Sequence, residues 1–400
     1  MAGKRTVAVV QYASFRSFPV GGISIFLESV LPNLAEAFDL KLIGMSLGEP
    51  IGKWTMIQVD GRAYDFLPIV GDKKSAFIPD RVRIALATFR HRRAIRESGA
   101  DAYYVHMTEA ALGLLTTRKP VLIHVHGLYN LFLFSRFSIG RTRLFPWIYE
   151  TFYPALFSRC ARVLGTGSLS EYESFTKLMR ITSGTRIPTC SRDRIFYPRE
   201  RESLRASFSI APEDRVVLFA GRMTPVKNLP MLLEAVRIVG REVQGLKLVM
   251  AGDGSARADA ECIAGGMPNV RFLGMLNAPQ LAEWMNAADV LALTSRIEGF
   301  PTAVVEGLSC GLPAVVTPVN AARELIQDGS GCDPRNGAIA VDFSVQTFAD
   351  ALRSVLMEPP HRDACVASIA DYKPEAVAQK IIAELEAVFG CEAGLRGSVR

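Results

Sequence analysis

Residues 290–317 read VLALTSRIEGFPTAVVEGLSCGLPAVVT, and they are the most informative part of the sequence. Its apolar start, Val290–Leu293, predicts a buried strand that ends in a polar turn. A helix is expected to open at Pro301-Thr302, because proline suits a first helical position, where its missing N–H is not needed. Residues 311–313, Gly-Leu-Pro, should end the helix before the next strand. The pattern is a strand–loop–helix–strand unit of a parallel sheet, whose strand ends bind anions and nucleotides.

Two glutamates eight residues apart mark this unit. Glu298 precedes the expected helix and Glu306 lies about one turn into it, within Glu-Gly-Phe-Pro and Glu-Gly-Leu-Ser-Cys-Gly-Leu-Pro. The string resembles the signature of the family 4 glycosyltransferases. That resemblance implies an α/β fold of two facing Rossmann-like domains, the GT-B architecture, and sugar transfer with retention from a nucleotide sugar. The alternative is an ordinary strand–helix junction with two solvated glutamates.

The composition is that of a folded globular protein. The 400 residues suggest two or three domains, with 49% apolar and 22% charged residues. The seven cysteines form no Cys-x-x-Cys pair, which favours a reducing cytoplasm over a disulfide framework. The N-terminal apolar stretch is too short for a signal peptide, and no apolar run reaches the length of a membrane span. A cytoplasmic location is therefore expected.

Charge is divided unevenly along the chain. Residues 1–200 contain 27 Lys and Arg against 16 Asp and Glu, whereas residues 201–400 contain 19 against 24. A net +11 in one half and −5 in the other suggests that the first half meets an anionic ligand or surface.

The first half opens with a predicted strand at Thr6–Val10, a loop containing Gly21 and Gly22, and a helix with apolar residues at helical spacing. Such a loop lets the backbone come close to a phosphate or a sugar. The resemblance implies the same, since the family's N-terminal domain opens with a glycine loop. A flexible turn is the alternative.

A second strand end carries histidines. Residues 120–127, Pro-Val-Leu-Ile-His-Val-His-Gly, predict a buried strand on which His124 and His126 share one face. The resemblance places a functional histidine at His126, facing the crevice between the domains. His124 is expected to be buried and hydrogen-bonded.

Two stretches of the first half are basic. Residues 79–98 predict an amphipathic helix rich in arginine, and residues 129–149 interleave aromatic and basic side chains. This composition suits an anionic membrane surface or an acceptor with a lipid tail. A solvated helix face and a core helix pair with a basic rim are the alternatives. No nucleic-acid fold signature is present, so no nucleic-acid partner is expected.

The second half begins with a predicted strand at 215–220, a loop, and a helix at 229–239. The loop contains Arg222 and Lys227, which match the family's Gly-Arg…Lys element for the donor phosphates. Breaking a sugar–phosphate bond leaves negative charge on the diphosphate, which these two cations can stabilise. No acidic metal motif of the Asp-x-Asp type is present, so neither a metal nor another cofactor is expected. The family's Pro-Asn-Gly-Val-Asp is also absent, and Ile-Pro-Thr-Cys-Ser-Arg-Asp at 187–193 holds its place.

The resemblance implies a division into domains and a substrate for each of the two main domains. Residues 1–195 would bind the acceptor, residues 196–370 would bind a nucleotide-diphosphate-sugar, and a C-terminal helix in 371–400 would pack back on the first domain. The acceptor would be a glycan or a lipid-linked precursor of a cell-envelope polysaccharide. A lipid-linked acceptor would place the protein peripherally on the inner face of the plasma membrane.

Residue roles follow from the same resemblance. Glu306 would hold the ribose hydroxyls and Glu298 the hydroxyls of the donor sugar, because a carboxylate accepts two such bonds well. The segment Gly299-Phe300-Pro301-Thr302 would add the charge of a helix N-terminus at the diphosphate. His126, Arg222, Lys227 and Glu298 are the catalytic candidates of this retaining hexosyltransferase. A nucleotide-sugar epimerase and a non-catalytic subunit on the same fold are the alternative functions.

Overall fold

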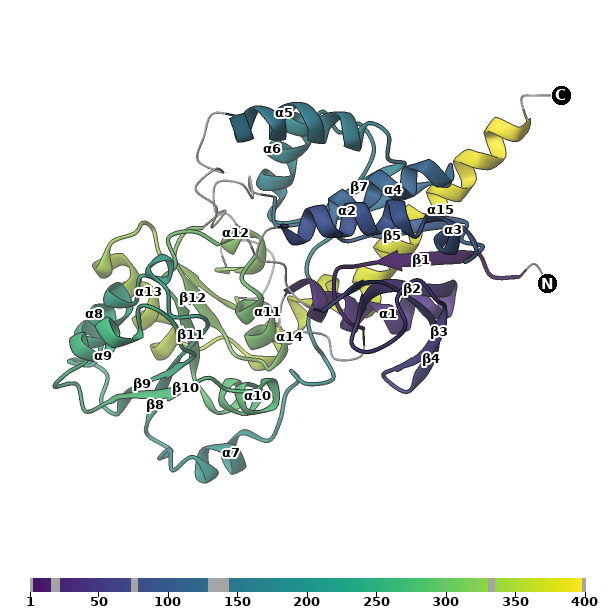
Figure 1. The fold of residues 1–400 in the computed structure, drawn as a ribbon. Helices are drawn as coiled ribbons and strands as arrows, with labels where there is room; N and C mark the ends of the chain where they lie inside the picture. Colours follow the sequence, from purple (N-terminus) through teal and green to yellow (C-terminus); the bar gives the residue numbers. More distant parts are fainter. Residues whose placement is uncertain are drawn as a thin grey trace. The chain divides into compact units, whose positions relative to one another are not determined.

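The computed structural model describes residues 3–15, 22–72, 78–128, 144–298, 300–319, 321–329 and 335–397. The chain divides into two compact units: unit 1 comprises Met1–Thr189 with Glu375–Arg400, and unit 2 comprises Cys190–Pro374. Each unit is an α/β body around a mostly parallel sheet, as the sequence predicts (Figure 1).

The sheet of unit 1 has the strand order β3-β4-β2-β1-β5-β6-β7. β1 pairs in parallel with β2 on one side and β5 on the other, so the strand order reverses at β1. Side chains of β1, β5 and β6 are buried almost throughout, as expected for strands covered on both faces. The strands are β1 Thr6–Val10, β2 Asp39–Ser46, β3 Thr55–Val59, β4 Arg62–Gly71, β5 Ala102–Val105, β6 Val121–His126 and β7 Arg162–Thr166.

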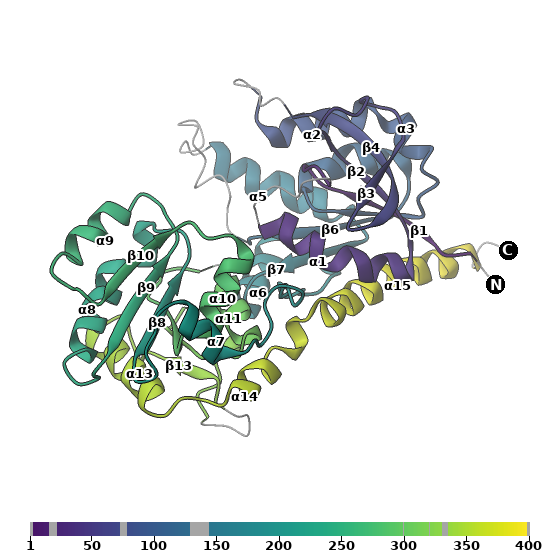
Figure 2. The ribbon, with the colours of Figure 1, turned by 90° about the horizontal axis from the view of Figure 1, so that it is seen from below.

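Helices cover this sheet, and α2 packs against α4 (Figures 1 and 2). The helices of unit 1 are α1 Gly22–Ala37, α2 Asp80–Arg90, α3 Arg92–Arg96, α4 Ala111–Leu114, α5 Leu144–Phe157, α6 Leu169–Met179 and α15 Pro374–Gly397. α15 contacts the beginning of the chain, with the Phe389 ring 6.1 Å from that of Phe38 and the Arg5 guanidinium 5.4 Å from the Phe389 ring. Glu384 on α15 also pairs with Arg162 of β7 at 3.4 Å.

Two features of unit 1 differ from the sequence prediction. Residues 79–98 form two helices, α2 and α3, instead of one, and His91 lies between them. Residues 46–78, which have no clear pattern, include the antiparallel hairpin β3–β4. Its turn is Asp60-Gly61, with positive φ at both residues (51° and 78°), as a two-residue hairpin turn needs.

The sheet of unit 2 has the order β10-β9-β8-β11-β12-β13, and each of its pairings is parallel. Its order reverses at β8, whose neighbours are β9 and β11. The strands are β8 Arg215–Ala220, β9 Leu246–Ala251, β10 Val270–Gly274, β11 Val290–Leu293, β12 Ala314–Val316 and β13 Gly337–Ile339.

The helices of unit 2 include α8, which matches its predicted bounds and packs against α13. They are α7 Arg201–Ser207, α8 Leu229–Val239, α9 Arg257–Ile263, α10 Ala278–Ala287, α11 Thr302–Ser309, α12 Ala322–Leu325, α13 Val345–Met357 and α14 Arg362–Ala367. Pro301 is the N-cap of α11, so the helix begins at Thr302, one position after the first helical residue expected from the sequence. Within the described part of the chain, no helix is long and apolar enough to cross a membrane.

Candidate functional site

The two motifs of the second half meet at the carboxyl edge of the unit 2 sheet. β8 and β11 are neighbours, with Val217 opposite Val290, so the loops that follow them lie side by side. The loop after β8 ends in a 3₁₀ turn at Pro225–Lys227. Thr294, just after β11, fixes that turn by donating its hydroxyl to the Lys227 carbonyl at 2.9 Å. Ligands of parallel sheets bind where the strand order reverses, which is the position of these loops.

Lys227 and Glu298 form an ion pair at this edge. The Lys227 ammonium donates a hydrogen bond to Glu298 Oε1, and the Ser295 hydroxyl donates to the same oxygen at 2.6 Å. Both side chains are largely buried, with 19% and 12% of their surface exposed. The sequence prediction assigns Lys227 to the diphosphate of a donor and Glu298 to its sugar. In the structure the two side chains are paired with each other.

Arg222 lies on the same loop and is exposed. Within the described residues it takes part in no ion pair or hydrogen bond. The loop is held against the one after β9, where Gly252 has φ +137° and where an added Cβ would lie 1.9 Å from the Gly221 carbonyl oxygen. Only glycine at this position lets the two loops come so close together. The Arg222 side chain lies at the surface of this edge of the sheet.

Glu306 is buried on α11 and is paired with Arg192. Arg192 donates to Glu306 Oε1 from Nε at 3.2 Å and from Nη2 at 2.7 Å. Burial raises the pKa of Glu306 above its ordinary value, and the neighbouring guanidinium opposes that rise. Arg192 is a site residue that the sequence prediction missed. Its only signal was the loss of the Pro-Asn-Gly-Val-Asp pattern at 187–193.

The N-terminus of α11 completes this edge. Its N-cap, Pro301, makes no capping hydrogen bond through its side chain. Thr302 is exposed, and the partly buried Phe300 ring lies 5.8 Å from the Tyr372 ring. An uncapped helix start of this kind presents partial positive charge to an anion. Gly299 lies outside the described residues.

At the carboxyl edge of the unit 1 sheet, three histidines lie together. His126 ends β6, and its Nε2 lies 2.8 Å from Nδ1 of His106, which follows β5. His124 is fully buried, as expected, between the Tyr104 hydroxyl at 2.7 Å and the Thr166 hydroxyl at 2.8 Å. The sequence prediction missed His106, whose position just after a buried strand beside β1 was the available signal.

These histidines are uncharged. Burial lowers the pKa of His126 to about 3, and it lowers the pKa values of His106 and His124 well below the ordinary value. One nitrogen from each ring lies within 4.8 Å of the others, and imidazole nitrogens are ligands that suit transition metals. Both nitrogens of His124 are already hydrogen-bonded, however, and its ring stacks on that of His126 at 4.2 Å. The cluster is therefore organised as a neutral hydrogen-bonded group.

The glycine loop of the first half is described only in part. Gly22 is the first residue of α1, directly beyond the loop that follows β1. Gly21 lies outside the described residues, as does most of the aromatic and basic stretch 129–149.

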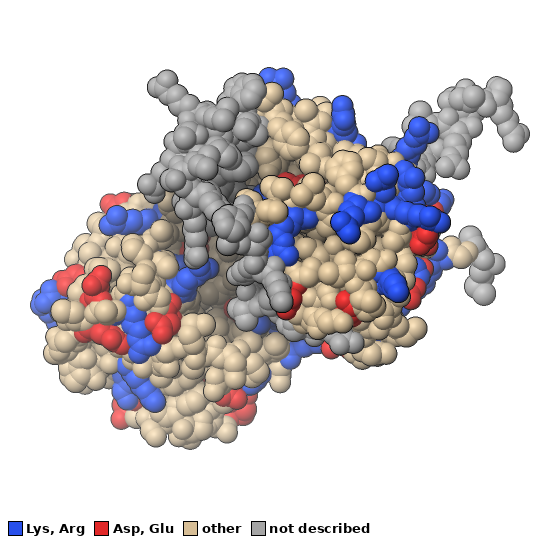
Figure 3. All heavy atoms as spheres, viewed as in Figure 1, with Lys and Arg blue, Asp and Glu red and all other residues tan. Residues whose placement is uncertain are grey.

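The arginines of α2 and α3 divide into two groups. Arg81 pairs with Glu109 at 2.6 Å, and Arg83 bonds the Tyr12 hydroxyl at 2.6 Å and Asp80 at 3.2 Å, so neither belongs to a solvated face. The other four, Arg90, Arg92, Arg93 and Arg96, are exposed, and Arg96 donates a hydrogen bond to the Thr116 carbonyl at 2.7 Å. Figure 3 shows Lys and Arg side chains gathered on unit 1.

Beside these arginines, α2 exposes apolar side chains. Val82, Leu86 and Phe89 are 46%, 58% and 40% exposed, whereas Ile84 and Ala87 face the core. The exposed three recur at helical spacing and form one stripe. We call Val82, Leu86, Phe89, Arg90, Arg92 and Arg93 the α2 surface.

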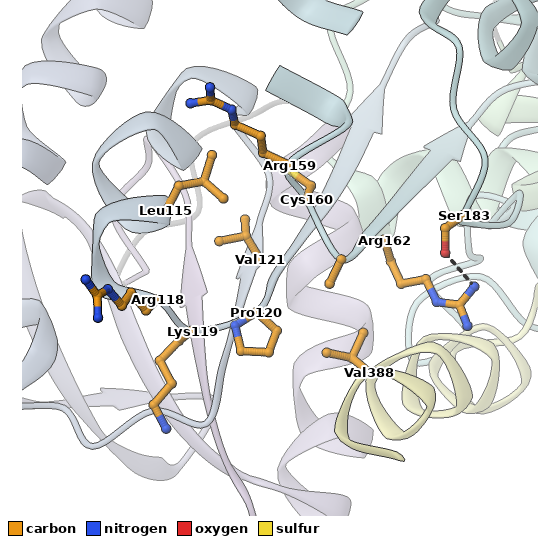
Figure 4. Close-up of a pocket in the computed structure, with 11 residues that line it drawn as sticks. Leu115, Arg118, Lys119, Pro120, Val121, Arg159, Cys160, Arg162, Ser183 and Val388 are labelled. Carbon is orange, nitrogen blue, oxygen red and sulfur yellow. Dashed lines mark hydrogen bonds between the residues drawn. The ribbon is translucent and has the colours of Figure 1, made fainter. Parts of the chain in front are cut away.

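A separate cavity of about 430 Å³ lies in unit 1 at the amino ends of β6 and β7 (Figure 4). It is therefore at the opposite edge of the sheet from His126. Of its basic residues, Arg162 is bonded to Ser183 at 3.0 Å and Lys119 lies 3.9 Å from Asp101. The guanidinium groups of Arg118 and Arg159 lie well apart in Figure 4, so the cations do not converge on one point.

Comparisons with known proteins place the likeness of sequence mainly in unit 2. Residues 200–371 match the family model "Glycosyl transferases group 1". The D-inositol 3-phosphate glycosyltransferase of Jonesia denitrificans is 28% identical over 174 residues, which is 41% of this chain and 40% of that protein. D-inositol 3-phosphate glycosyltransferase 2 of Catenulispora acidiphila is 30% identical over 202 residues, 48% and 44% of the two chains. The alignments thus span less than half of these relatives.

Solved structures extend the likeness to both units. The crystal structure of Anabaena HepE in complex with UDP and glucose covers 96% of this chain and 100% of that one, with a TM-score of 0.65 and 14% identity. At that identity the likeness concerns the fold, which is GT-B. Residues 200–371 are therefore similar to the group 1 glycosyl transferases, and the chain as a whole shares the fold of the Anabaena structure.

Proposed function

We propose that this protein transfers a sugar, with retention, from a nucleotide-diphosphate-sugar to a glycan or lipid-linked acceptor. One observation carries the proposal: Arg222, Lys227, Glu298 and the start of α11 converge at the carboxyl ends of β8 and β11, which are adjacent strands. Cations suit the diphosphate, and a carboxylate suits sugar hydroxyls. The Anabaena structure, which holds UDP and glucose on the same fold, supports this class of donor.

The residues of unit 2 would act on the departing diphosphate. Arg222 clamps it with a guanidinium fork, Lys227 adds a point charge, and the α11 amides add partial charge. Because Lys227 is paired with Glu298 before the donor arrives, the donor exchanges partners with that pair. The diphosphate replaces the carboxylate at Lys227, and sugar hydroxyls meet Glu298. Glu306 receives the ribose hydroxyls.

Retention requires no protein nucleophile in this scheme. The leaving phosphate takes the proton from the acceptor hydroxyl on the face that it is departing from, and His126 supports the sugar as a neutral group. The acceptor is bound by unit 1. The α2 surface, with its apolar stripe beside three exposed arginines, would hold the protein on an anionic membrane where a lipid-linked acceptor is found.

The test is a donor panel on the purified full chain. UDP-, GDP- and ADP-sugars are offered without acceptor, and binding, hydrolysis and product configuration are measured. A glycosyltransferase binds one nucleotide class and slowly hydrolyses that donor, and Lys227→Ala abolishes this hydrolysis. Release of an epimerised nucleotide sugar would overturn the proposal in favour of an epimerase, and binding without turnover would favour a non-catalytic subunit.

A further inference from the structure

Arg192 contacts Glu306 in an unusual way. A guanidinium commonly pairs with both oxygens of a carboxylate. Here the two N–H groups, at 3.2 and 2.7 Å, both bond Oε1. No described residue makes a hydrogen bond to Oε2 of Glu306, so the second oxygen is left for another donor.

The Arg192 side chain is held firmly in this position. Its guanidinium lies 4.8 Å from the centre of the Phe196 ring, which is buried in the core of unit 2. The backbone turns directly after it, because Ile195 and Phe196 both donate their amides to the Arg192 carbonyl at 2.8 Å. On the other side, the Ser191 amide bonds the Tyr372 carbonyl at 2.8 Å. A side chain fixed in this way can orient its partner.

We propose that Arg192 is a positioning residue of the donor site, which holds Glu306 ionised by Oε1 and presents Oε2 to the ribose hydroxyls of a ribonucleoside diphosphate. This inference rests on the proposed function. A buried carboxylate without a partner would take up a proton, and as an acid it would no longer be oriented as an acceptor. Arg192 therefore selects for ribose through Glu306, although its own contacts are with protein.

The experiment compares UDP, GDP and ADP with their 2′,3′-dideoxy counterparts, by calorimetric titration of the full chain. For the nucleotide that binds best, wild type should prefer the ribose form by roughly 10- to 100-fold, the value of a charged hydrogen bond. Arg192→Ala should bring the two forms to within about threefold, mainly by weakening the ribose form. Arg192→Lys, which keeps the charge without the fork, should give an intermediate ratio.

Arg199 offers a matched control. It lies in the same segment, with its guanidinium 4.8 Å from the Tyr197 ring and 3.8 Å from Glu283, and it has no bond to Glu306. Arg199→Ala should keep the wild-type ribose preference. In the Arg192→Ala/Glu306→Gln double variant, the ribose preference should be no lower than in Glu306→Gln alone, because the two substitutions remove the same interaction.

The outcomes separate the inference from the proposed function. If Arg192→Ala weakens the ribose and dideoxy forms equally, or if it leaves the preference intact, the inference is overturned while nucleotide binding still stands. Absence of binding by wild type to any of the three nucleotides would overturn both. Thermal unfolding of each variant shows whether it is folded, and Arg192→Lys decides the question if Arg192→Ala is not.

Discussion

The carboxyl edges of the two sheets have opposite electrostatic designs. In unit 1, the buried His106 and His124 and the partly buried His126 form a neutral group whose hydrogen bonds need no charge. In unit 2, the same edge carries two ion pairs, Lys227 with Glu298 and Arg192 with Glu306. Protonation of a group that burial keeps neutral makes stability depend on pH. Paired charges can instead exchange partners with a charged ligand. The two edges should therefore respond to different changes, unit 1 to pH and unit 2 to the removal of a charged side chain.

The largest effect is expected from the cations of unit 2. Arg222→Ala and Lys227→Ala should each lower turnover by about 100- to 1,000-fold, because each removes charge from the departing diphosphate. Steady-state kinetics with the donor identified by the panel measures this, and circular dichroism shows that the fold is intact. Near-normal turnover in both variants would remove the basis for the assignment.

Stability should fall with acid, and the histidines of unit 1 should cause it. Their folded pKa values are depressed, so their contribution is complete above the unfolded pKa of about 6.5 and is lost as pH falls toward the folded values. Between pH 7.5 and 5.5, protonation that is favoured only in the unfolded chain should lower the unfolding free energy by on the order of 1 kcal/mol per histidine. Urea unfolding at both pH values measures the loss.

Two variants sharpen this second prediction. His124→Gln should flatten the pH dependence, because one depressed group is gone. The exposed His361 of unit 2 lies outside the cluster and is the control. If wild type, His124→Gln and His361→Gln lose the same free energy between the two pH values, the neutral cluster is not the cause.

A smaller effect is expected at the α2 surface. Replacing Arg90, Arg92 and Arg93 together with Ala should weaken binding to anionic vesicles by more than tenfold at low salt, since each contributes attraction to anionic lipid. High salt should weaken wild type in the same way. Co-sedimentation measures both, with the unit 2 triple replacement of Arg237, Arg241 and Arg271 as control. Equal binding to neutral and anionic vesicles would contradict electrostatic docking, and no binding to either would favour a soluble acceptor.

The smallest effect should come from a chelator. In the proposed mechanism Arg222 and Lys227 supply the charge that a divalent metal would otherwise place at the diphosphate. Turnover with EDTA should therefore remain within about twofold of turnover without it. This change is far smaller than the loss of turnover expected when Arg222 or Lys227 is replaced. Loss of activity that is restored by Mg²⁺ or Mn²⁺ would show that a metal takes part.

Much of the fold could be predicted from sequence because its signals are local. The apolar run Val290–Leu293 and the boundaries of α8 follow from periodicity and turn residues, and the structure has both where the sequence puts them. The hairpin β3–β4 could also have been found from Asp60-Gly61 between alternating apolar residues. It was not predicted because the alternation is short, with Ile57 and Val59 before the turn and Tyr64 and Phe66 after it.

The partners within the sites could not be predicted in this way. Arg192 and Glu306 are 114 residues apart, and His106 and His126 meet only because β5 and β6 are adjacent. Arg81 and Arg83 looked like part of a solvated face, yet they bond Glu109 and Tyr12. Such pairings depend on the tertiary structure, which periodicity along one helix does not contain.

The C-terminal helix has a consequence for how the chain is made. Unit 1 is built from both ends of the chain. Phe38 contacts Phe389, which is synthesised only after all of unit 2. On the ribosome, unit 2 is therefore complete before unit 1 is, although unit 1 emerges first. A chain released early would leave the surface around Phe38 uncovered and prone to aggregation. Pulse-labelled chains halted at residue 373 should be protease-resistant in unit 2 and sensitive in unit 1.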